Sequence, residues 1–375
     1  MTKALTPRAL ILGAILSIVV AMYSAFLGLK IGGVYWPIIT TSIMAMAILT
    51  FLKNTNVNEI NIAQTAASAG GLLAAGIIFT MPAIFLLGFE VEIWEISLIS
   101  LLGGLLGILF SVPLREEMIV RENLSYPDGT TAAALIQAGD EKGEKAKLLF
   151  YAFGVGAVFS FLRDYLKIIP SFFNLDTLKL SIADRFSFGS SVSFVAIAGG
   201  FLIGPRFTAA WFFGAIVSYF AIIPYMLTVG MYSDKFFTAV EFTKPLGIGV
   251  VIGAALAYFL VKGIPAFVNF FKTLNVGKQY FNSKMLVLFV FIVILITILA
   301  DFNPLLSIIA IVGAFIMAYI AGRVTGEMNV DPMEIFAMIV LIVAKLLFGF
   351  NAILLVFLAA IVAIAAGMAG ILCRI

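Results

Sequence analysis

Four polar residues recur at helical spacing within a stretch that is otherwise apolar or small. Asn61, Gln64, Thr65 and Ser68 stand at positions i, i+3, i+4 and i+7, which places them on one face of a helix. If that helix lies in a membrane, each amide and hydroxyl needs a partner from another helix or from water. The face therefore suits a path that holds a polar solute. It equally suits the packing of one helix on another, which uses the same residue types.

A second candidate is the turn Tyr126-Pro-Asp-Gly-Thr-Thr131, because Pro-Asp-Gly is a strong turn signal. Asp128 or Thr130 can cap the short helix expected to follow. The free N–H groups of a helix N-terminus, with Gly129 allowing close approach, would suit an anionic group such as a carboxylate. An ordinary capped turn in a cytoplasmic loop is the alternative.

A third candidate is the stretch from Gly322 to Glu334. Asp331, Pro332 and Glu334 fit the N-cap, N1 and N3 positions of a following helix, so their role is read as structural. Glu327 has no such structural role and is the best carboxylate for proton coupling. Arg323 can pair with Glu327 or bind the carboxylate of a substrate.

Ionisable residues close to apolar runs add a few further candidates. Lys30 is a basic residue between two glycines at the expected end of a helix, and Pro37 follows. The stretch from Gly322 to Pro332 has the same pattern, which suggests an internal repeat. Lys345 falls within an apolar run, where an ionisable residue is a functional candidate unless it reaches an interface. Arg163 and Asp164 are read as an ion pair near a helix end.

The composition sets the class of protein that must position these residues. The chain has 375 residues, 63% hydrophobic and 11% charged, with a mean hydropathy of +1.15. These values exclude a soluble enzyme, a disordered protein and a nucleic-acid binder. Long apolar runs, rather than short alternating strands, favour helices over a β-barrel. With no histidine and only Cys373, we expect no metal site, no cofactor and no His-based proton relay.

The apolar runs predict an all-α, polytopic transmembrane helical bundle of about eleven to twelve spans. A short re-entrant or interfacial helix is expected near 127–138. We interpret residues 1–375 as a single transmembrane domain, with a cytoplasmic or re-entrant loop at 113–147 and an outer loop at 169–187. The spans are expected at 8–29, 34–52, 60–88, 95–113, 148–168, 190–204, 206–229, 246–262, 285–301, 304–322, 333–349 and 351–372.

Lys and Arg concentrate in alternate loops between these runs. By the positive-inside rule this favours an even number of spans, with both termini cytoplasmic. The N-terminal run 9–29 is long for a signal peptide and is interpreted as the first span. We expect a multi-pass protein of the plasma membrane.

The candidates resemble, in their order along the chain, the motifs of the oligopeptide transporter (OPT) family, which includes the yellow-stripe-like carriers. The resemblance implies import of small peptides or peptide-like metal chelates, with proton symport. It implies that the Asn61–Ser68 face and the Tyr126–Thr131 segment line the central path, and that Glu327 is a coupling or gating carboxylate. The matching stretches are Gly28–Gly32 with Trp36-Pro37, Asn61–Gly71, Phe79–Ala83, Pro113–Glu117, Leu124–Ala132, Gly204–Arg206, and Gly322–Glu327 with Pro332.

Members of this family are substantially longer and continue past a helix like 351–372 into a further polar motif. We therefore keep several expectations open: a short carrier, a carrier completed by a homo-oligomer or partner chain, and a transport-incompetent truncated member or channel. A membrane-embedded enzyme is disfavoured, because it would need a convergent catalytic set, and the sequence has no histidine, a single cysteine near its end and no pair of intramembrane aspartates. ATP-driven transport is disfavoured because there is no Walker motif.

Overall fold

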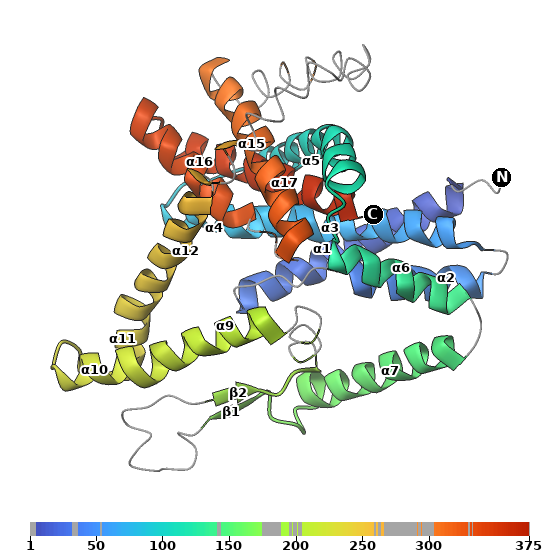
Figure 1. Cartoon of the computed structure of the whole chain (residues 1–375), viewed down its shortest axis with the longest axis horizontal. Coiled ribbons are helices and arrows are strands. Elements are labelled where there is room, and N and C mark those ends of the chain that lie inside the picture. The colour runs from blue at the N-terminus through green and yellow to red at the C-terminus, as the bar shows by residue number, and fades with distance from the viewer. Residues whose placement is uncertain are drawn as a thin grey trace. The chain divides into compact units, whose positions relative to one another are not determined.

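The computed structural model describes residues 5–31, 37–52, 55–140, 144–174, 189–194, 205–258, 304–328, 331 and 333–374, with a few isolated positions between 197 and 294. The chain divides into two compact units (Figure 1). One consists of residues 1–140 with 255–375, and the other of residues 141–254. Each unit is treated separately below.

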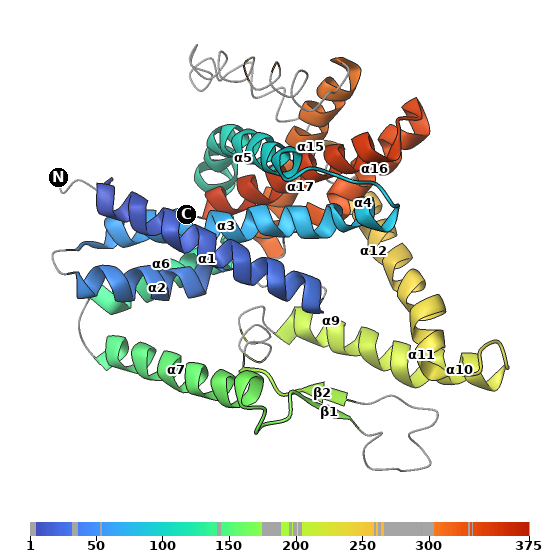
Figure 2. The ribbon, with the colours of Figure 1, turned by 180° about the vertical axis from the view of Figure 1, so that it is seen from behind.

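The first unit is a bundle of helices that differ greatly in length (Figure 2). Its described elements are α1 (Pro7–Ile31), α2 (Ile38–Phe51), α3 (Val57–Thr80), α4 (Pro82–Leu86), α5 (Ile93–Arg115), the π-helical turn η1 (Glu116–Arg121), α6 (Pro127–Asp140), α15 (Pro304–Met328), α16 (Met333–Phe348) and α17 (Ala352–Arg374).

Side chains fix the ends of several of these helices. The Asn56 side chain accepts a hydrogen bond from the Glu59 N–H at 2.9 Å and caps α3, and Glu92 and Glu95 form a capping box at the start of α5. Lys345 lies in the last turn of α16, where its Nζ donates to the Phe350 carbonyl at 3.0 Å. This bond holds the Lys345 cation at the C-terminal end of α16, and its reach to a membrane interface stays a prediction.

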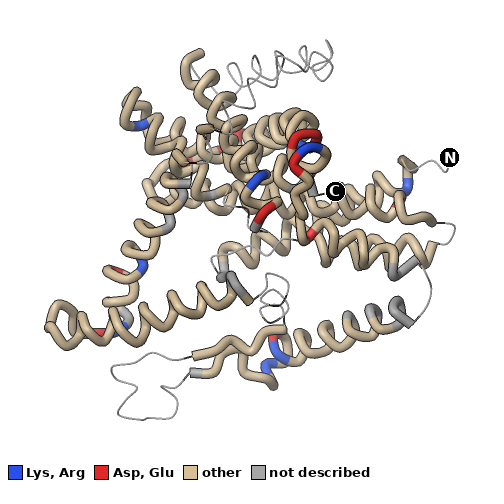
Figure 3. Tube along the Cα trace, in the orientation of Figure 1, with Lys and Arg blue, Asp and Glu red and all other residues tan. Residues whose placement is uncertain are grey.

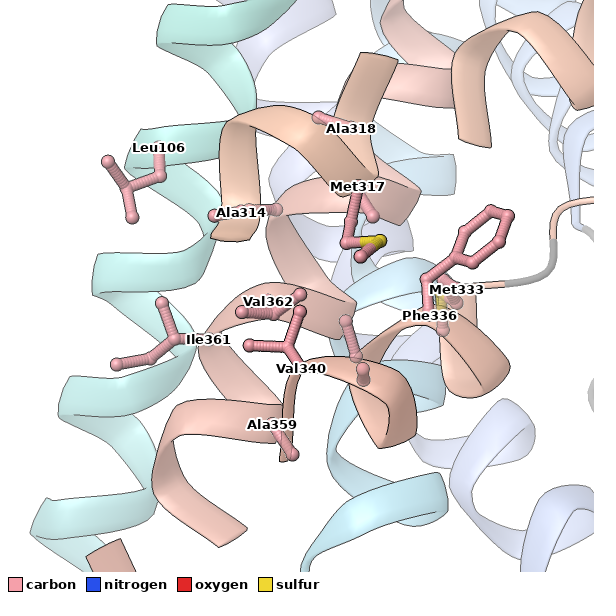
Figure 4. Packing of buried hydrophobic residues seen from close by; sticks show 14 of the residues in the cluster. Leu106, Ala314, Met317, Ala318, Met333, Phe336, Val340, Ala359, Ile361 and Val362 are labelled. Atoms are coloured by element: carbon pink, nitrogen blue, oxygen red, sulfur yellow. The ribbon is translucent and has the colours of Figure 1, made fainter. Parts of the chain in front are cut away.

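Helix α17 forms the centre of the first unit. It carries no charge between Ala352 and Cys373, and from Leu355 to Ala369 all its residues are buried among α3, α5, α15 and α16 (Figure 4). A helix that is apolar on every face belongs in the middle of a bundle. Glycines of its neighbours let it approach closely. A Cβ at Gly76 of α3 would lie 2.4 Å from Ile364 Cγ1, and one at Gly107 of α5 would lie 2.4 Å from Met368 Cβ.

Among the described residues, six helices are long and apolar enough to cross a membrane, which confirms an all-α polytopic bundle. They are Pro7–Leu29, Val57–Leu86, Ile93–Arg121, Thr208–Thr228, Pro304–Glu327 and Ala352–Gly370, and Ile38–Phe51 and Ile335–Phe348 are shorter apolar helices. Most of the expected spans at 190–204 and 285–301 lies outside the described residues. The total of eleven to twelve spans therefore stays a prediction, and so does the single domain over 1–375.

The expected loop at 113–147 contains the predicted short helix, which is α6, Pro127–Asp140. The chain enters it from α5 through η1 and a connection of five residues. Ala132 of α6 packs with Ile38 of α2 and Leu72 of α3, so α6 lies against the bundle. Its re-entrant or interfacial position stays a prediction.

The second unit contains shorter helical pieces and one two-stranded sheet. Strands β1 and β2 are antiparallel, with Phe172 opposite Ser191, and they flank most of the expected outer loop 169–187. Arg163 binds Asp164 at 2.7 Å and donates to the Val192 carbonyl at 2.7 Å, which supports the ion-pair interpretation. The elements are α7 (Glu144–Ser160), η2 (Phe161–Tyr165), β1 (Phe172–Asn174), β2 (Gly189–Ser191), α9 (Pro205–Ile216), η5 (Val217–Ile222), α10 (Ile223–Thr228), α11 (Lys235–Thr238), η6 (Ala239–Thr243) and most of α12 (Lys244–Tyr258), whose residues from Ala255 onward are assigned to the first unit.

Candidate functional site at the Tyr126 turn

The Tyr126 turn binds the C-terminal end of α15, nearly two hundred residues further along the chain. The Tyr126 N–H and the Ser125 hydroxyl both donate to the Gly326 carbonyl at 3.2 Å, and the Tyr126 hydroxyl donates to the Gly322 carbonyl at 2.9 Å. The Gly326 carbonyl is one of the last four of α15, which lack partners within the helix. The turn therefore caps α15, and it joins two candidates that the sequence presents separately.

Two glycines make this contact close enough. A Cβ at Gly326 would lie 2.8 Å from Leu124 Cδ1 and 3.0 Å from Tyr126 Cε2, and one at Gly322 would lie 2.9 Å from Met118 Sδ. Distances this short require a neighbour to move. The Gly-x-x-x-Gly spacing of α15 thus provides the surface on which the turn docks.

The turn is strained at two residues. Asn123 has φ +51° and Tyr126 has φ +40°, in the left-handed region. Asparagine tolerates this conformation, but a bulky aromatic residue rarely adopts it. Such strain costs on the order of 1–3 kcal/mol and persists where surrounding contacts hold it. Here the bonds from Tyr126 to α15 supply that restraint, since its side chain is only 3% exposed.

Helix α6 starts immediately after Tyr126, so the C-terminal end of α15 and the N-terminal end of α6 meet at one residue. The Thr130 N–H donates to the Tyr126 carbonyl at 3.1 Å, and the Thr130 hydroxyl donates to the Pro127 carbonyl at 2.9 Å. Asp128 and Gly129 are buried and Thr130 is exposed. Tyr126, rather than Asp128 or Thr130, therefore stands directly before the helix.

A cluster of charges lies beside this junction, at the end of η1 and in the last turns of α15 (Figure 3). Arg323 donates through Nε to Glu327 at 3.0 Å and through Nη1 to Glu122 at 2.9 Å. The sequence predicts the first pair, because the two residues are four apart on one helix. It misses Glu122, which lies in a charged run that reads as an ordinary loop. The position of Glu122 shortly before the Tyr126 turn is the feature of the sequence that could have indicated a functional role.

Glu122 lies one residue beyond the end of the candidate span Ile93–Arg121. Burial raises the pKa of its carboxyl above the ordinary value, and the Arg323 guanidinium opposes that effect without cancelling it. The group is therefore easier to protonate than an exposed glutamate.

The Asn61–Ser68 face lies at the junction of α3 with α1 and α2. Gln64 and Ser68 are buried, whereas Asn61 and Thr65 are partly exposed. The hydroxyls of Thr65 and Ser68 donate to the carbonyls of Asn61 and Gln64 in their own helix, at 2.7 and 2.9 Å. Gln64 Nε2 donates to Asn61 Oδ1 at 3.1 Å. Some of the polar groups on this face thus find their hydrogen-bond partners within α3. Asn61 and Thr65, which are partly exposed, are best placed to contact a solute.

A buried carboxylate near this face escapes the sequence analysis. Glu59 is fully buried and accepts hydrogen bonds from Arg8 and Thr6 near the start of α1, and from Thr55 at 3.0 Å. Glu59 lies three residues after Asn56, which is the spacing between an N-cap residue and an acidic residue at position N3 of a helix. This spacing is the feature of the sequence that could have identified Glu59. The Arg8–Glu59 pair joins the N-terminal ends of α1 and α3.

The remaining candidates are placed only in part. Lys30 belongs to the last turn of α1, and its side chain lies outside the described set. Asp331 is 3% exposed and lies just before α16, where it packs close to Gly370 of α17. That position agrees with a structural role at the start of the helix.

The match to a known family covers the Tyr126 turn and α3 but not α15. Residues 4–264 match the family profile described as OPT oligopeptide transporter protein. Over 204 residues the chain is 31% identical to a Haemophilus influenzae protein named "Putative oligopeptide transporter", covering 53% of this chain and 32% of that protein. Over 159 residues it is 30% identical to a similarly named protein of Saccharomyces cerevisiae, covering 36% of this chain and 22% of the other. The chain therefore spans no more than about a third of the length of either relative.

Proposed function

Because the chain belongs to the oligopeptide transporter family, we propose that it is a secondary active transporter that imports small peptides or peptide-like metal chelates. The observation that carries the proposal is the junction at Tyr126, where two helix ends of opposite polarity meet beside Arg323 and Glu327. In many secondary transporters the ends of discontinuous helices bind ions and the charged groups of substrates.

In this proposal the substrate carboxylate binds near the N-terminus of α6, formed by Tyr126, Asp128, Gly129 and Thr130, and is attracted by Arg323. Amide and hydroxyl groups suit the peptide bonds of a substrate, which need donors and acceptors inside a membrane. Asn61, Gln64, Thr65 and Ser68 line the path toward this region, with Lys30 at one end.

Proton symport is the proposed driving reaction, with Glu327 as the coupling carboxylate. A chain without histidine has to move protons through carboxylates, tyrosine or water. The proposed setting is the plasma membrane with both termini in the cytoplasm, as the distribution of Lys and Arg favours. A homo-oligomer or a partner chain would complete the carrier if this chain does not transport alone. No enzymatic reaction is part of the proposal.

A ligand screen followed by transport tests the function. We expect di- to hexapeptides or their metal chelates to raise the melting temperature of the detergent-solubilised chain. The strongest hit should then show saturable counterflow in proteoliposomes and accumulate when a pH gradient is imposed. Conductance without saturation would identify a channel, and no uptake with any hit would identify a transport-incompetent chain.

The proposed path is tested by variants of its two partly exposed members. Asn61→Ala and Thr65→Ala should weaken counterflow while the protein remains folded, because both side chains can reach a solute. Ser97→Ala is the matched control, since the Ser97 hydroxyl donates to the Ile93 carbonyl at 2.8 Å on the exposed side of α5. Equal counterflow in all three variants would show that the polar face only packs helices together.

A further inference from the structure

Two carboxylates share one guanidinium at the Tyr126 junction. Arg323 Nη1 binds Glu122 Oε1 at 2.9 Å, and Arg323 Nε binds Glu327 Oε1 at 3.0 Å. With both carboxylates ionised, this group of three has one negative charge in excess. One carboxylate can therefore take up a proton while Arg323 keeps an anionic partner. The geometry leaves open only which of the two takes it.

The two carboxylates differ in their surroundings. Glu122 Oε2 is buried and has no hydrogen-bond partner among the described residues, whereas its Oε1 is held by Arg323. The Glu122 side chain is 25% exposed, and that of Glu327 is 35% exposed. A buried carboxylate oxygen without a donor disfavours the charged form far more than the neutral one. Water still reaches part of the Glu122 side chain, although Oε2 itself is covered.

The charges that face Glu122 come from two elements. Glu117 of η1 and Glu327 of α15 are like charges that favour its neutral form, and Arg323 of α15 favours its ionised form. Tyr319 of α15 also reaches this group, with its hydroxyl 3.5 Å from Arg323 Nη1. Burial is the largest influence, so the pKa of the Glu122 carboxyl lies above that of an exposed glutamate.

We propose that Glu122 is the proton-binding carboxylate of this site, and that Glu327 holds Arg323 while Glu122 is neutral. This inference rests on the proposed function and deepens it, since it divides the coupling role between two residues. A hydronium ion transfers a proton to Glu122 Oε2: one O–H bond of the hydronium breaks, an O–H bond forms on the carboxyl group, and a water molecule is left. The Glu122 carboxyl loses its charge, its ion pair with Arg323 becomes a neutral hydrogen bond, and Arg323 stays paired with Glu327.

The place of Glu122 in the chain connects this proton to the substrate region. Its N–H donates to the Glu117 carbonyl at 2.9 Å, and the next residue is Asn123, the first of the two strained positions. The Glu122–Arg323 ion pair thus ties the strained turn to α15. When Glu122 is neutral that tie weakens, and the turn that begins α6 is held chiefly by the bonds from Ser125 and Tyr126 to α15.

Infrared titration of the full chain in detergent, without any substrate, tests proton binding directly. Acidification should produce the C=O band of a protonated carboxylic acid at higher pH than exposed glutamates do, and Glu122→Gln should remove that component. Glu90→Gln is the control at an exposed carboxylate and should leave it unchanged. In Glu327→Gln the component should persist with its midpoint moved to lower pH, because a facing negative charge is lost. Persistence in Glu122→Gln would overturn the proposal.

Transport adds a second test that separates this inference from the proposed function. In proteoliposomes with the strongest peptide hit, Glu122→Gln should retain counterflow at fixed pH and lose accumulation driven by a pH gradient. If the wild-type chain moves no peptide, the proposed function fails, and the infrared result still decides whether Glu122 binds the proton. Gradient-driven accumulation that survives in Glu122→Gln would assign the transported proton to another group.

Discussion

Tyr126 holds two helix ends together through its main chain and its hydroxyl at the same time. Replacing it with phenylalanine keeps the ring and removes the hydroxyl, with its hydrogen bond to the Gly322 carbonyl at 2.9 Å and its contact with Met118 Sδ at 3.1 Å. A single buried hydrogen bond of this kind contributes about 0.5–1.5 kcal/mol. We therefore expect Tyr126→Phe to lower the melting temperature in detergent measurably. Tyr151→Phe, at a side chain that is 72% exposed, should leave it unchanged. Equal melting temperatures for both variants would contradict the docking role of the hydroxyl.

The pH dependence of stability offers a second measurement at the residue scale. Because the pKa of Glu122 is raised above 4.5 in the folded protein, the folded state binds this proton more tightly than the unfolded state. That contribution is present in full below about pH 4.5 and is lost as the pH rises through the folded pKa. The difference in melting temperature between wild type and Glu122→Gln should therefore change with pH across this window. A difference that stays constant with pH would show that Glu122 titrates normally.

The sequence predicts contacts within the site when the two residues are close along the chain, and misses them when the residues are far apart. Arg323 and Glu327 lie four residues apart on one helix, so their pairing follows from spacing alone. Glu122 lies 201 residues from Arg323, and Glu59 lies 51 residues from Arg8. Such partners are brought together by packing, which no local pattern encodes. The sequence identifies the Tyr126 turn and the Gly322–Glu327 stretch as separate motifs, but it does not predict that they contact each other.

Close packing of α1 on α3 gives a test at the scale of elements. A Cβ at Gly70 would lie 2.1 Å from the Ser17 carbonyl oxygen and 2.8 Å from its carbon, so Gly70→Ala must push two backbones apart. Overpacking of this kind typically costs about 1–3 kcal/mol. We expect a clear fall in melting temperature. Gly104→Ala is the matched control, because its Cβ would be 3.4 Å from Leu73 Cδ2, an ordinary contact. A fall of the same size in both would contradict the close approach.

Most helices of the first unit follow from their sequence, but the details of their ends do not. The predicted spans at 8–29, 304–322 and 351–372 correspond to α1, α15 and α17, because long apolar runs leave few alternatives. The run predicted at 60–88 divides at Met81 into α3 and α4, since Pro82 lacks an N–H and begins a new helix. No residue pattern in the sequence predicts that α5 continues as the π-helical turn η1.

The suspected internal repeat gains support at the scale of the whole molecule. Two groups of three helices pack in the same way. In the first group, α1 and α2 both pack on α3, and in the second, α15 and α16 both pack on α17. In both, a long helix ends shortly before a proline, Pro37 or Pro332, and a shorter apolar helix follows. The repeat places Lys30 and Arg323 at comparable positions, near the ends of the long helices.

The central position of α17 predicts that this helix tolerates change least. Ala363 is fully buried, so Ala363→Phe should abolish the compact fold or lower the melting temperature strongly. Leu101→Phe adds a ring at a position of α5 that is 56% exposed and should have little effect. Detergent melting and size-exclusion profiles of the two variants measure the difference. Comparable profiles would contradict a core built around α17.

The same helix imposes an order on biosynthesis. The ribosome makes α3, α5, α15 and α16 before α17, yet the glycine faces of α3 and α5 are shaped to receive it. Until α17 is inserted, those faces meet lipid or another temporary occupant, and the earlier helices have no common centre on which to close. Helices such as α1, α2 and α3 can pack on one another earlier, but the part of the unit that surrounds α17 cannot reach its final packing before α17 is made. The close contacts of α3 and α5 with α17 therefore form late, after synthesis of the last described helix.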